Sequence, residues 1–86
     1  MRLIYSLIEA EEERQKRKIY KPENYGVMDW LAFLIEEVGE LSQGITAIRY
    51  RGSQDHNNVV RQAVQVAALA IRIAERYGAY EVEDEG

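Results

Sequence analysis

The chain has 86 residues, of which 47% are hydrophobic and 30% are charged, and its formal net charge is −4. This acidic balance argues against nucleic acid and anionic membranes as partners, because both attract proteins with an excess of Lys and Arg. The absence of cysteine excludes disulfides and thiolate metal sites, and no apolar stretch has the length of a signal-peptide core or a membrane span. We therefore expect a soluble cytoplasmic protein.

The first predicted helix covers about residues 2–17. Apolar residues recur at helical spacing near its amino end, and the stretch that follows is dense in good helix formers. The apolar positions are Leu3, Ile4, Leu7 and Ile8. Residues 21–26 contain proline, asparagine and glycine, which favour turns over helix, and these residues predict a linker.

A second helix is predicted from Asp29, a good N-cap residue, to the residues just before Gly52. On a helical wheel its apolar side chains form one stripe, which we expect to face the core. The stripe consists of Leu34, Val38, Leu41, Ile45 and Ile48. Residues 51–55 then predict a loop, in which Asp55 or one of the two asparagines after it can cap the next helix.

The third predicted helix ends near Tyr77, before Gly78, and is apolar around nearly its whole circumference. Such a helix is buried on several sides, and two helices of one chain cover only some of them. A second copy of the chain is expected to cover the rest. We therefore expect an all-α fold in which residues 1–80 form one three-helix domain within an oligomeric helical bundle, a dimer or tetramer. Residues 81–86 are expected to form a frayed acidic tail.

Three carboxylates lie beside the apolar stripe of the second helix. Glu36, Glu37 and Glu40 fall within one sector of about 100°, because positions three and four residues apart are neighbours on a helix. Gly44 lies in the same sector and predicts open space beside them. Like charges this close repel one another, and Mg²⁺ or Mn²⁺, which prefer oxygen ligands, would relieve the repulsion. The cluster predicts an open, phosphate-handling metal site, and the alternative is the solvated face of an amphipathic helix.

A family resemblance rests on segments of all three predicted helices. Residues 30–41 read Trp-Leu-Ala-Phe-Leu-Ile-Glu-Glu-Val-Gly-Glu-Leu, and residues 62–68 read Gln-Ala-Val-Gln-Val-Ala-Ala. Together with Glu13-Arg14-Gln15, they resemble the MazG-like branch of the all-α nucleoside triphosphate pyrophosphohydrolases. That family's first motif, E-E-x-x-E, is complete here, and the likeness covers most of residues 9–77.

The resemblance implies a helical dimer or tetramer that hydrolyses a nucleoside triphosphate to the monophosphate and pyrophosphate with Mg²⁺ or Mn²⁺. It also implies that Glu36, Glu37 and Glu40 bind the metal and are the catalytic residues. The metal would activate a water for attack at the α-phosphorus and neutralise charge on the phosphate oxygens.

The sequence departs from the family at the second motif, E-x-x-D, where it has Gln62 and Gln65. Both amides can still face the second helix, with Gln65 as a metal ligand and Gln62 as a substrate-binding residue, but the two lost charges predict weaker metal binding. Alternatively, the glutamines form a satisfied hydrogen-bonding pair between helices. A further alternative is a catalytically lapsed MazG-like oligomer that binds nucleotide or a protein partner without hydrolysis.

Three further residues are predicted to contact the substrate. Lys18 and Arg49 can pair with phosphate oxygens, and the alternative is that they are solvated surface charges. Trp30 can stack on a nucleobase, and the alternative is a place in the core.

Overall fold

The computed structural model describes residues 2–18 and 25–78, and within them it contains three helices and no strand. These are α1 (Arg2–Lys18), α2 (Val27–Tyr50) and α3 (His56–Arg76). The predicted all-α fold is thereby confirmed. The predicted tail, residues 81–86, and most of the predicted linker lie outside the described residues. No helix in the described part of the chain is long and apolar enough to cross a membrane.

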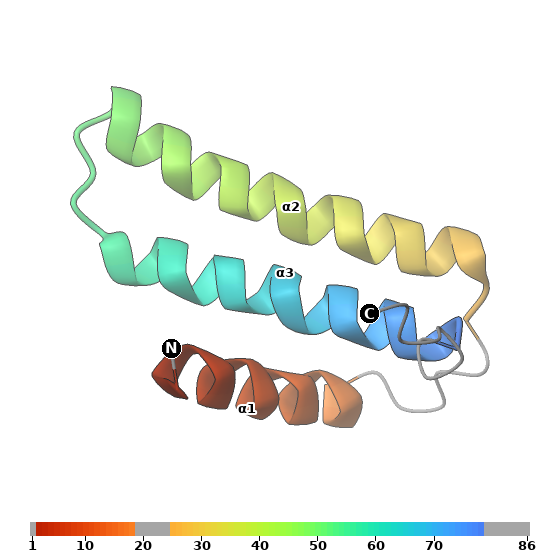
Figure 1. Ribbon diagram of the computed structural model, residues 1–86. Helices are drawn as coiled ribbons and strands as arrows, with labels where there is room; N and C mark the ends of the chain where they lie inside the picture. Colours follow the sequence, from red (N-terminus) through yellow and green to blue (C-terminus); the bar gives the residue numbers. More distant parts are fainter. Residues whose placement is uncertain (1, 19–24, 79–86) are drawn as a thin grey trace, which may run out of the picture.

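Helix α3 lies between the other two helices and packs against both (Figure 1). Helices α1 and α3 run in the same direction, and α2 runs antiparallel to them (Figure 1). Both α1 and α2 pack on α3, and side chains of α1 and α2 line one cavity beside it. This arrangement positions the candidate site described below.

The ends of the helices follow local capping rules, with one correction to the expected pattern. Asp55 is the N-cap of α3, and its Oδ1 accepts a hydrogen bond from the backbone N–H of Asn58 at 3.1 Å. Helix α2, in contrast, begins before Asp29. Gly26 is its N-cap, and Asp29 lies in the first turn, where its Oδ2 accepts from the N–H of Gly26 at 2.9 Å. An acidic residue in the first turn is also favoured by the helix dipole. Gly78, just after α3, has the positive φ of 85° typical of a helix C-terminus.

The core of the single chain is small. Its buried apolar residues are Trp30, Val64, Ala68 and Leu69. A polar network buried between α1 and α3 extends it: Gln15 donates from Nε2 to Oε2 of Glu11 at 2.9 Å and to the backbone oxygen of Gln65 at 3.1 Å. Gln15 Oε1 accepts a hydrogen bond from Arg72 at 3.3 Å. Specific polar contacts therefore hold α1 in register on α3.

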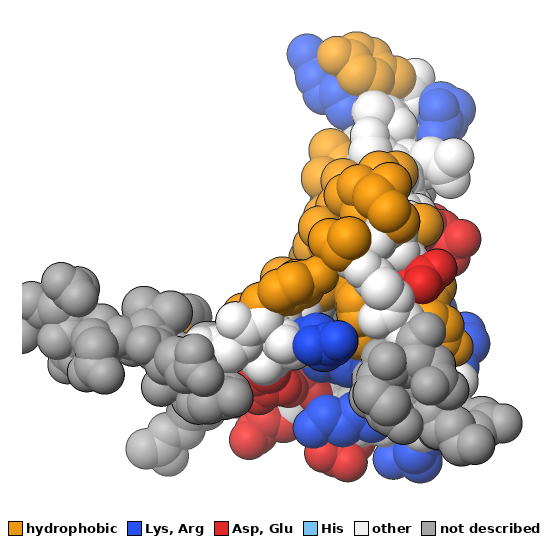
Figure 2. Space-filling view, turned by 90° about the vertical axis from the view of Figure 1, so that its right-hand side faces the viewer, with side chains coloured by type: hydrophobic (Ala, Val, Ile, Leu, Met, Phe, Trp, Pro, Cys, Tyr) orange, Lys and Arg blue, Asp and Glu red, His pale blue; other side chains and the backbone are white. Residues whose placement is uncertain are grey.

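An apolar face remains exposed on α2. We define it by four side chains that are between 44% and 62% exposed, Leu31, Ile35, Val38 and Ile45. Figure 2 shows hydrophobic side chains gathered in a band, with acidic side chains to its right and below it. Val38 and Ile45 were expected in the core stripe, and this expectation is wrong for the single chain, because α3 covers only the neighbouring sector of α2. Helix α3 adds exposed alanines, Ala63, Ala70 and Ala74.

Candidate metal centre

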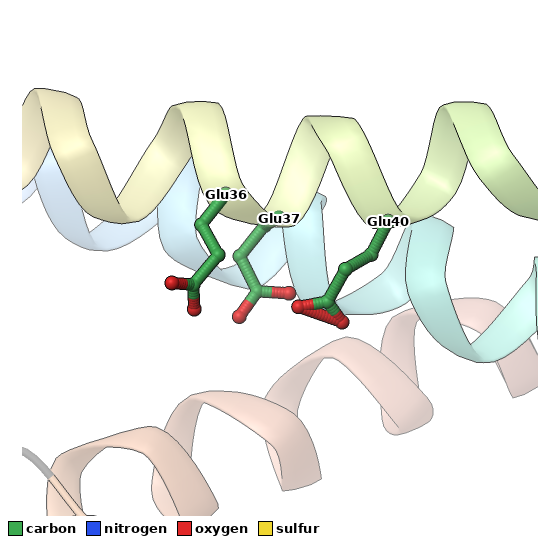
Figure 3. Close-up of side chains that lie close together, drawn as sticks. All are labelled: Glu36, Glu37 and Glu40. Atoms are coloured by element: carbon green, nitrogen blue, oxygen red, sulfur yellow. The ribbon is translucent and has the colours of Figure 1, made fainter.

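Glu36, Glu37 and Glu40 form a carboxylate cluster on α2. One carboxylate oxygen from each residue lies within 4.8 Å of the corresponding oxygens of the other two. The three side chains project from adjacent positions of α2 toward α1 (Figure 3). Glu36 and Glu40 are exposed, whereas Glu37 is half-buried. The helical spacing therefore brings the three groups together as the sequence predicted.

Glu37 has the most perturbed environment in the cluster. Its Oε2 is buried, and no group among the described residues donates a hydrogen bond to it. Burial raises the pKa of the Glu37 carboxyl above its usual value, and the neighbouring charges of Glu40 and Glu36 raise it further. Arg14 acts in the opposite direction, since its positive charge lowers this pKa. The described residues therefore do not fully compensate the negative charge of an ionised Glu37 carboxylate.

A cavity of about 250 Å³ opens between α1 and α2 beside the cluster. Glu36 and Glu37 line one wall, and Arg14 and Lys18 line the wall that belongs to α1. Leu69 of α3 also lines it. The predicted Lys18 is therefore brought to the carboxylates. The residues at this cavity carry opposite charges on opposite walls, a combination that suits a metal ion bound to an anionic group.

Two aromatic residues complete this cavity, which we call the aromatic cavity. Tyr25 and Phe33 line it, and their ring centroids are 5.3 Å apart in an edge-to-face arrangement. Trp30, the aromatic residue predicted to stack on a base, lies instead in the core with 3% of its surface exposed. The guanidinium of Arg72 lies over its ring, 5.2 Å from the centroid. Packing of α3 against α2 buries Trp30 and leaves Tyr25 and Phe33 facing the cavity.

Gln62 and Gly44 meet at the interface between α3 and α2. Gln62 Oε1 is buried without a hydrogen-bond partner among the described residues. It lies 2.5 Å from the point that a Cβ on Gly44 would occupy, and Val59 Cγ2 lies 3.3 Å from that point. Gly44 is itself buried, so the expectation of open space there is wrong. A side chain at position 44 would therefore have to displace the end of the Gln62 side chain.

The two remaining predicted site residues, Gln65 and Arg49, lie in different places relative to the carboxylate cluster. Gln65 is half-buried on α3, and its backbone oxygen accepts the hydrogen bond from Gln15. Arg49 lies near the end of α2, more than two turns beyond Glu40, or roughly 13 Å along an axis that rises about 1.5 Å per residue. It lies over the ring of Tyr50 at 5.2 Å and does not line the aromatic cavity. The fold therefore keeps Arg49 away from the carboxylates.

Sequence reasoning missed two polar residues of α1, Glu11 and Arg14, as part of this region. Arg14 donates to the carboxylate of Glu11 from Nε at 2.8 Å and from a terminal nitrogen at 2.6 Å. The spacing of Glu11, Arg14 and Gln15 was a signal in the sequence, since side chains three and four residues apart on a helix can interact. Only their position opposite α2 required the fold.

Comparisons with models of protein families, with curated proteins and with solved structures find no match for this chain.

Proposed function

We propose that this protein is a Mg²⁺-dependent nucleoside triphosphate pyrophosphohydrolase of the MazG-like type, and Mn²⁺ is expected to replace Mg²⁺. The observation that carries the proposal is the carboxylate cluster, whose oxygens lie within 4.8 Å and whose Glu37 has a buried oxygen without a partner. A divalent cation would compensate both the mutual repulsion and this unpaired oxygen. The family resemblance of the same segment supports the assignment.

The donor set fits a hard divalent cation, because carboxylate oxygens are the ligands that Mg²⁺ prefers and an open site leaves room for water and phosphate oxygens. When bound, Mg²⁺ supplies charge neutralisation and an activated water. The contribution of the chain is to hold Glu36, Glu37 and Glu40 on one rigid helix. Lys18, which also lines the aromatic cavity, would offset the negative charge of a phosphate group.

In the proposed reaction the oxygen of a water molecule forms a bond to the α-phosphorus. The bond between that phosphorus and the oxygen that bridges to the β-phosphorus breaks, so the products are a nucleoside monophosphate and pyrophosphate. The water loses a proton in this step. Glu36 and Glu40 are exposed, and each would offer one carboxylate oxygen to the metal, which leaves its second oxygen to accept this proton.

A second proposal is a catalytically lapsed protein of the same type, which binds nucleotide or a protein partner without hydrolysis. It is favoured by the neutrality of Gln62 and Gln65, which add no negative charge to the cluster from α3. The packing of Gln62 Oε1 against Gly44 also favours it, because the side chain then serves contact between helices. The two proposals differ in turnover alone.

We further propose that the protein self-associates as a dimer or tetramer through the apolar face. Four large apolar side chains of α2 are between 44% and 62% exposed. Burying each in a partner would contribute about 1 kcal/mol, at about 25 cal/mol per Å² of apolar surface. At about 100° per residue this face lies on the opposite side of α2 from Glu36, Glu37 and Glu40, so association would leave the carboxylate cluster accessible.

The test is pyrophosphate release from ribo- and deoxynucleoside triphosphates with Mg²⁺ or Mn²⁺, for the wild type, Glu37→Gln and Glu40→Gln. The control is Glu9→Gln, which removes the same charge from an exposed position of α1 that lines neither cavity. We expect turnover that falls by about 100-fold in the two cluster variants, or about 2.7 kcal/mol, and is unchanged in the control. Absence of turnover with every substrate and metal, in folded protein, would refute the enzyme and favour the lapsed form.

A further inference from the structure

A second and larger cavity lies between α1 and the amino-terminal half of α3. Its volume is about 450 Å³. Three arginines line it, Arg14 and Arg17 from α1 and Arg61 from α3, and we call it the arginine cavity. Apolar side chains, Leu7, Val60 and Val64, also line it. A concentration of three guanidinium groups is notable in a chain whose net charge is −4.

The charge of this cavity is not neutralised by the described residues. Its one carboxylate, Glu11, is already engaged, because Arg14 donates to both of its oxygens and Gln15 donates to Oε2. Among the described residues, neither Arg17 nor Arg61 forms an ion pair with a carboxylate, and Arg61 donates to Oδ1 of Asn58. Two guanidinium groups are therefore available to an anion.

The arginine cavity and the aromatic cavity share one lining residue. Arg14 lines both the arginine cavity and the aromatic cavity, which Glu36 and Glu37 also line. Because α2 runs antiparallel to α1, Glu36 lies toward the carboxyl end of α1 and Glu40 toward its amino-terminal half (Figure 3). Arg14 therefore connects the arginine cavity to the cavity that Glu36 and Glu37 line.

We propose that the arginine cavity binds the pyrophosphate end of a nucleoside triphosphate, its β- and γ-phosphates. Planar guanidinium groups donate paired hydrogen bonds to phosphate oxygens, and two of them suit a group that carries several negative charges. We place the nucleoside against Tyr25 and Phe33 and the α-phosphate at the carboxylates, because the cavity that these residues line shares Arg14 with the arginine cavity. This orientation rests on the proposed function, whereas binding of pyrophosphate by itself does not.

The experiment is calorimetric titration of inorganic pyrophosphate into the metal-free protein, for the wild type, Arg17→Gln, Arg61→Gln and the double variant. Lys16→Gln is the matched control, because Lys16 pairs with Glu13 at 3.8 Å and lines neither cavity. We expect the dissociation constant to rise about 10-fold in each single variant and to be unchanged in the control. Circular dichroism of each variant checks that the helices are intact.

Two results would overturn the proposal: no binding of pyrophosphate by the wild type, or equal binding by the double variant. Displacement of pyrophosphate by sulfate at the same ionic strength would also overturn it, because it would mean general attraction of anions. Binding that depends on Arg17 and Arg61 without turnover would support this site while refuting the enzyme. Turnover with an unchanged KM in the double variant would refute this site while the enzyme stands.

Discussion

Gln62 Oε1 of α3 lies 2.5 Å from the point that a Cβ on Gly44 of α2 would occupy. The end of the Gln62 side chain thus occupies the space between the helices that a side chain at position 44 would need. This contact lies one turn from Glu40, so it sets the separation of α2 and α3 beside the carboxylate cluster.

Gly44→Ala tests this contact through two opposing effects. Alanine is favoured over glycine inside a helix by about 1 kcal/mol, but its Cβ must displace Gln62 and press on Val59. We expect a change in the free energy of unfolding within about 0.5 kcal/mol of zero in the wild type. In a Gln62→Ala background the same substitution should stabilise by about 1 kcal/mol. Urea denaturation of the four proteins measures the coupling, and additive effects would contradict the competition.

Glu37→Gln should stabilise the metal-free protein at neutral pH. Burial and the charges of Glu40 and Glu36 raise the pKa of Glu37, so the folded state binds its proton more tightly than the unfolded state does. The ionised carboxylate therefore costs stability once the pH exceeds its raised pKa, and the cost disappears as the pH falls below the usual value near 4.5. Thermal unfolding against pH measures this, and a stability advantage of Glu37→Gln that persists in acid would contradict it.

Two comparisons separate the effect of Glu37 from general acid sensitivity. Glu11 has a lowered pKa because of its hydrogen bond from Arg14, so Glu11→Gln should destabilise the protein at neutral pH and lose that effect as the pH falls through the lowered pKa. Addition of Mg²⁺ at neutral pH should raise the Tm of the wild type and not that of Glu37→Gln. Equal shifts in both proteins would indicate that Mg²⁺ binds elsewhere.

Gln15→Leu should destabilise the protein by about 2–3 kcal/mol, because it leaves buried polar groups without partners. Gln15 is 5% exposed and joins Glu11, the backbone of Gln65 and Arg72. Burial already lowers the pKa of Arg72, which is 5% exposed, and the substitution would remove the oxygen that accepts its hydrogen bond. Urea denaturation measures the effect against Lys16→Leu, an exposed position on the same helix. Equal values for the two variants would argue against the network.

Ile35→Lys should weaken self-association without loss of helix content. Ile35 is 62% exposed in the single chain, so lysine is accommodated there in a monomer. Within a buried interface the same lysine would be desolvated and unpaired, at a cost of several kcal/mol. Sedimentation velocity over a range of concentrations compares it with Glu9→Lys, a charge change on α1. A wild type that remains monomeric at every concentration would refute association through the apolar face.

The helices themselves were predictable because their signals are local. Asp55 caps α3 as expected, and the three helices lie close to the predicted ranges. The predicted start of α2 is too late, because aspartate is favoured both at the N-cap and in the first turn of a helix. Only the backbone conformation of Gly26 shows that Asp29 occupies the first turn. The carboxylate cluster was predictable because helical spacing alone brings its members together.

Contacts between helices were not predictable in this way. Gly44 was expected to leave open space, and its role depends on the side chain of Gln62 from another helix. The residues around Trp30 in the sequence are compatible both with stacking on a ligand and with packing in the core. The position of α3 buries Trp30 in the core.

By itself, the sequence determined which residues form helices and that Glu36, Glu37 and Glu40 share one face of a helix, because both depend on interactions within a few residues of the chain. Only the tertiary structure decided that α1 faces this cluster with Arg14 and Lys18, and that Arg17 and Arg61 meet in one cavity. The physical reason is that these residues belong to different helices, and the burial of Gln15 and Arg72 between α1 and α3 sets the register that brings them together.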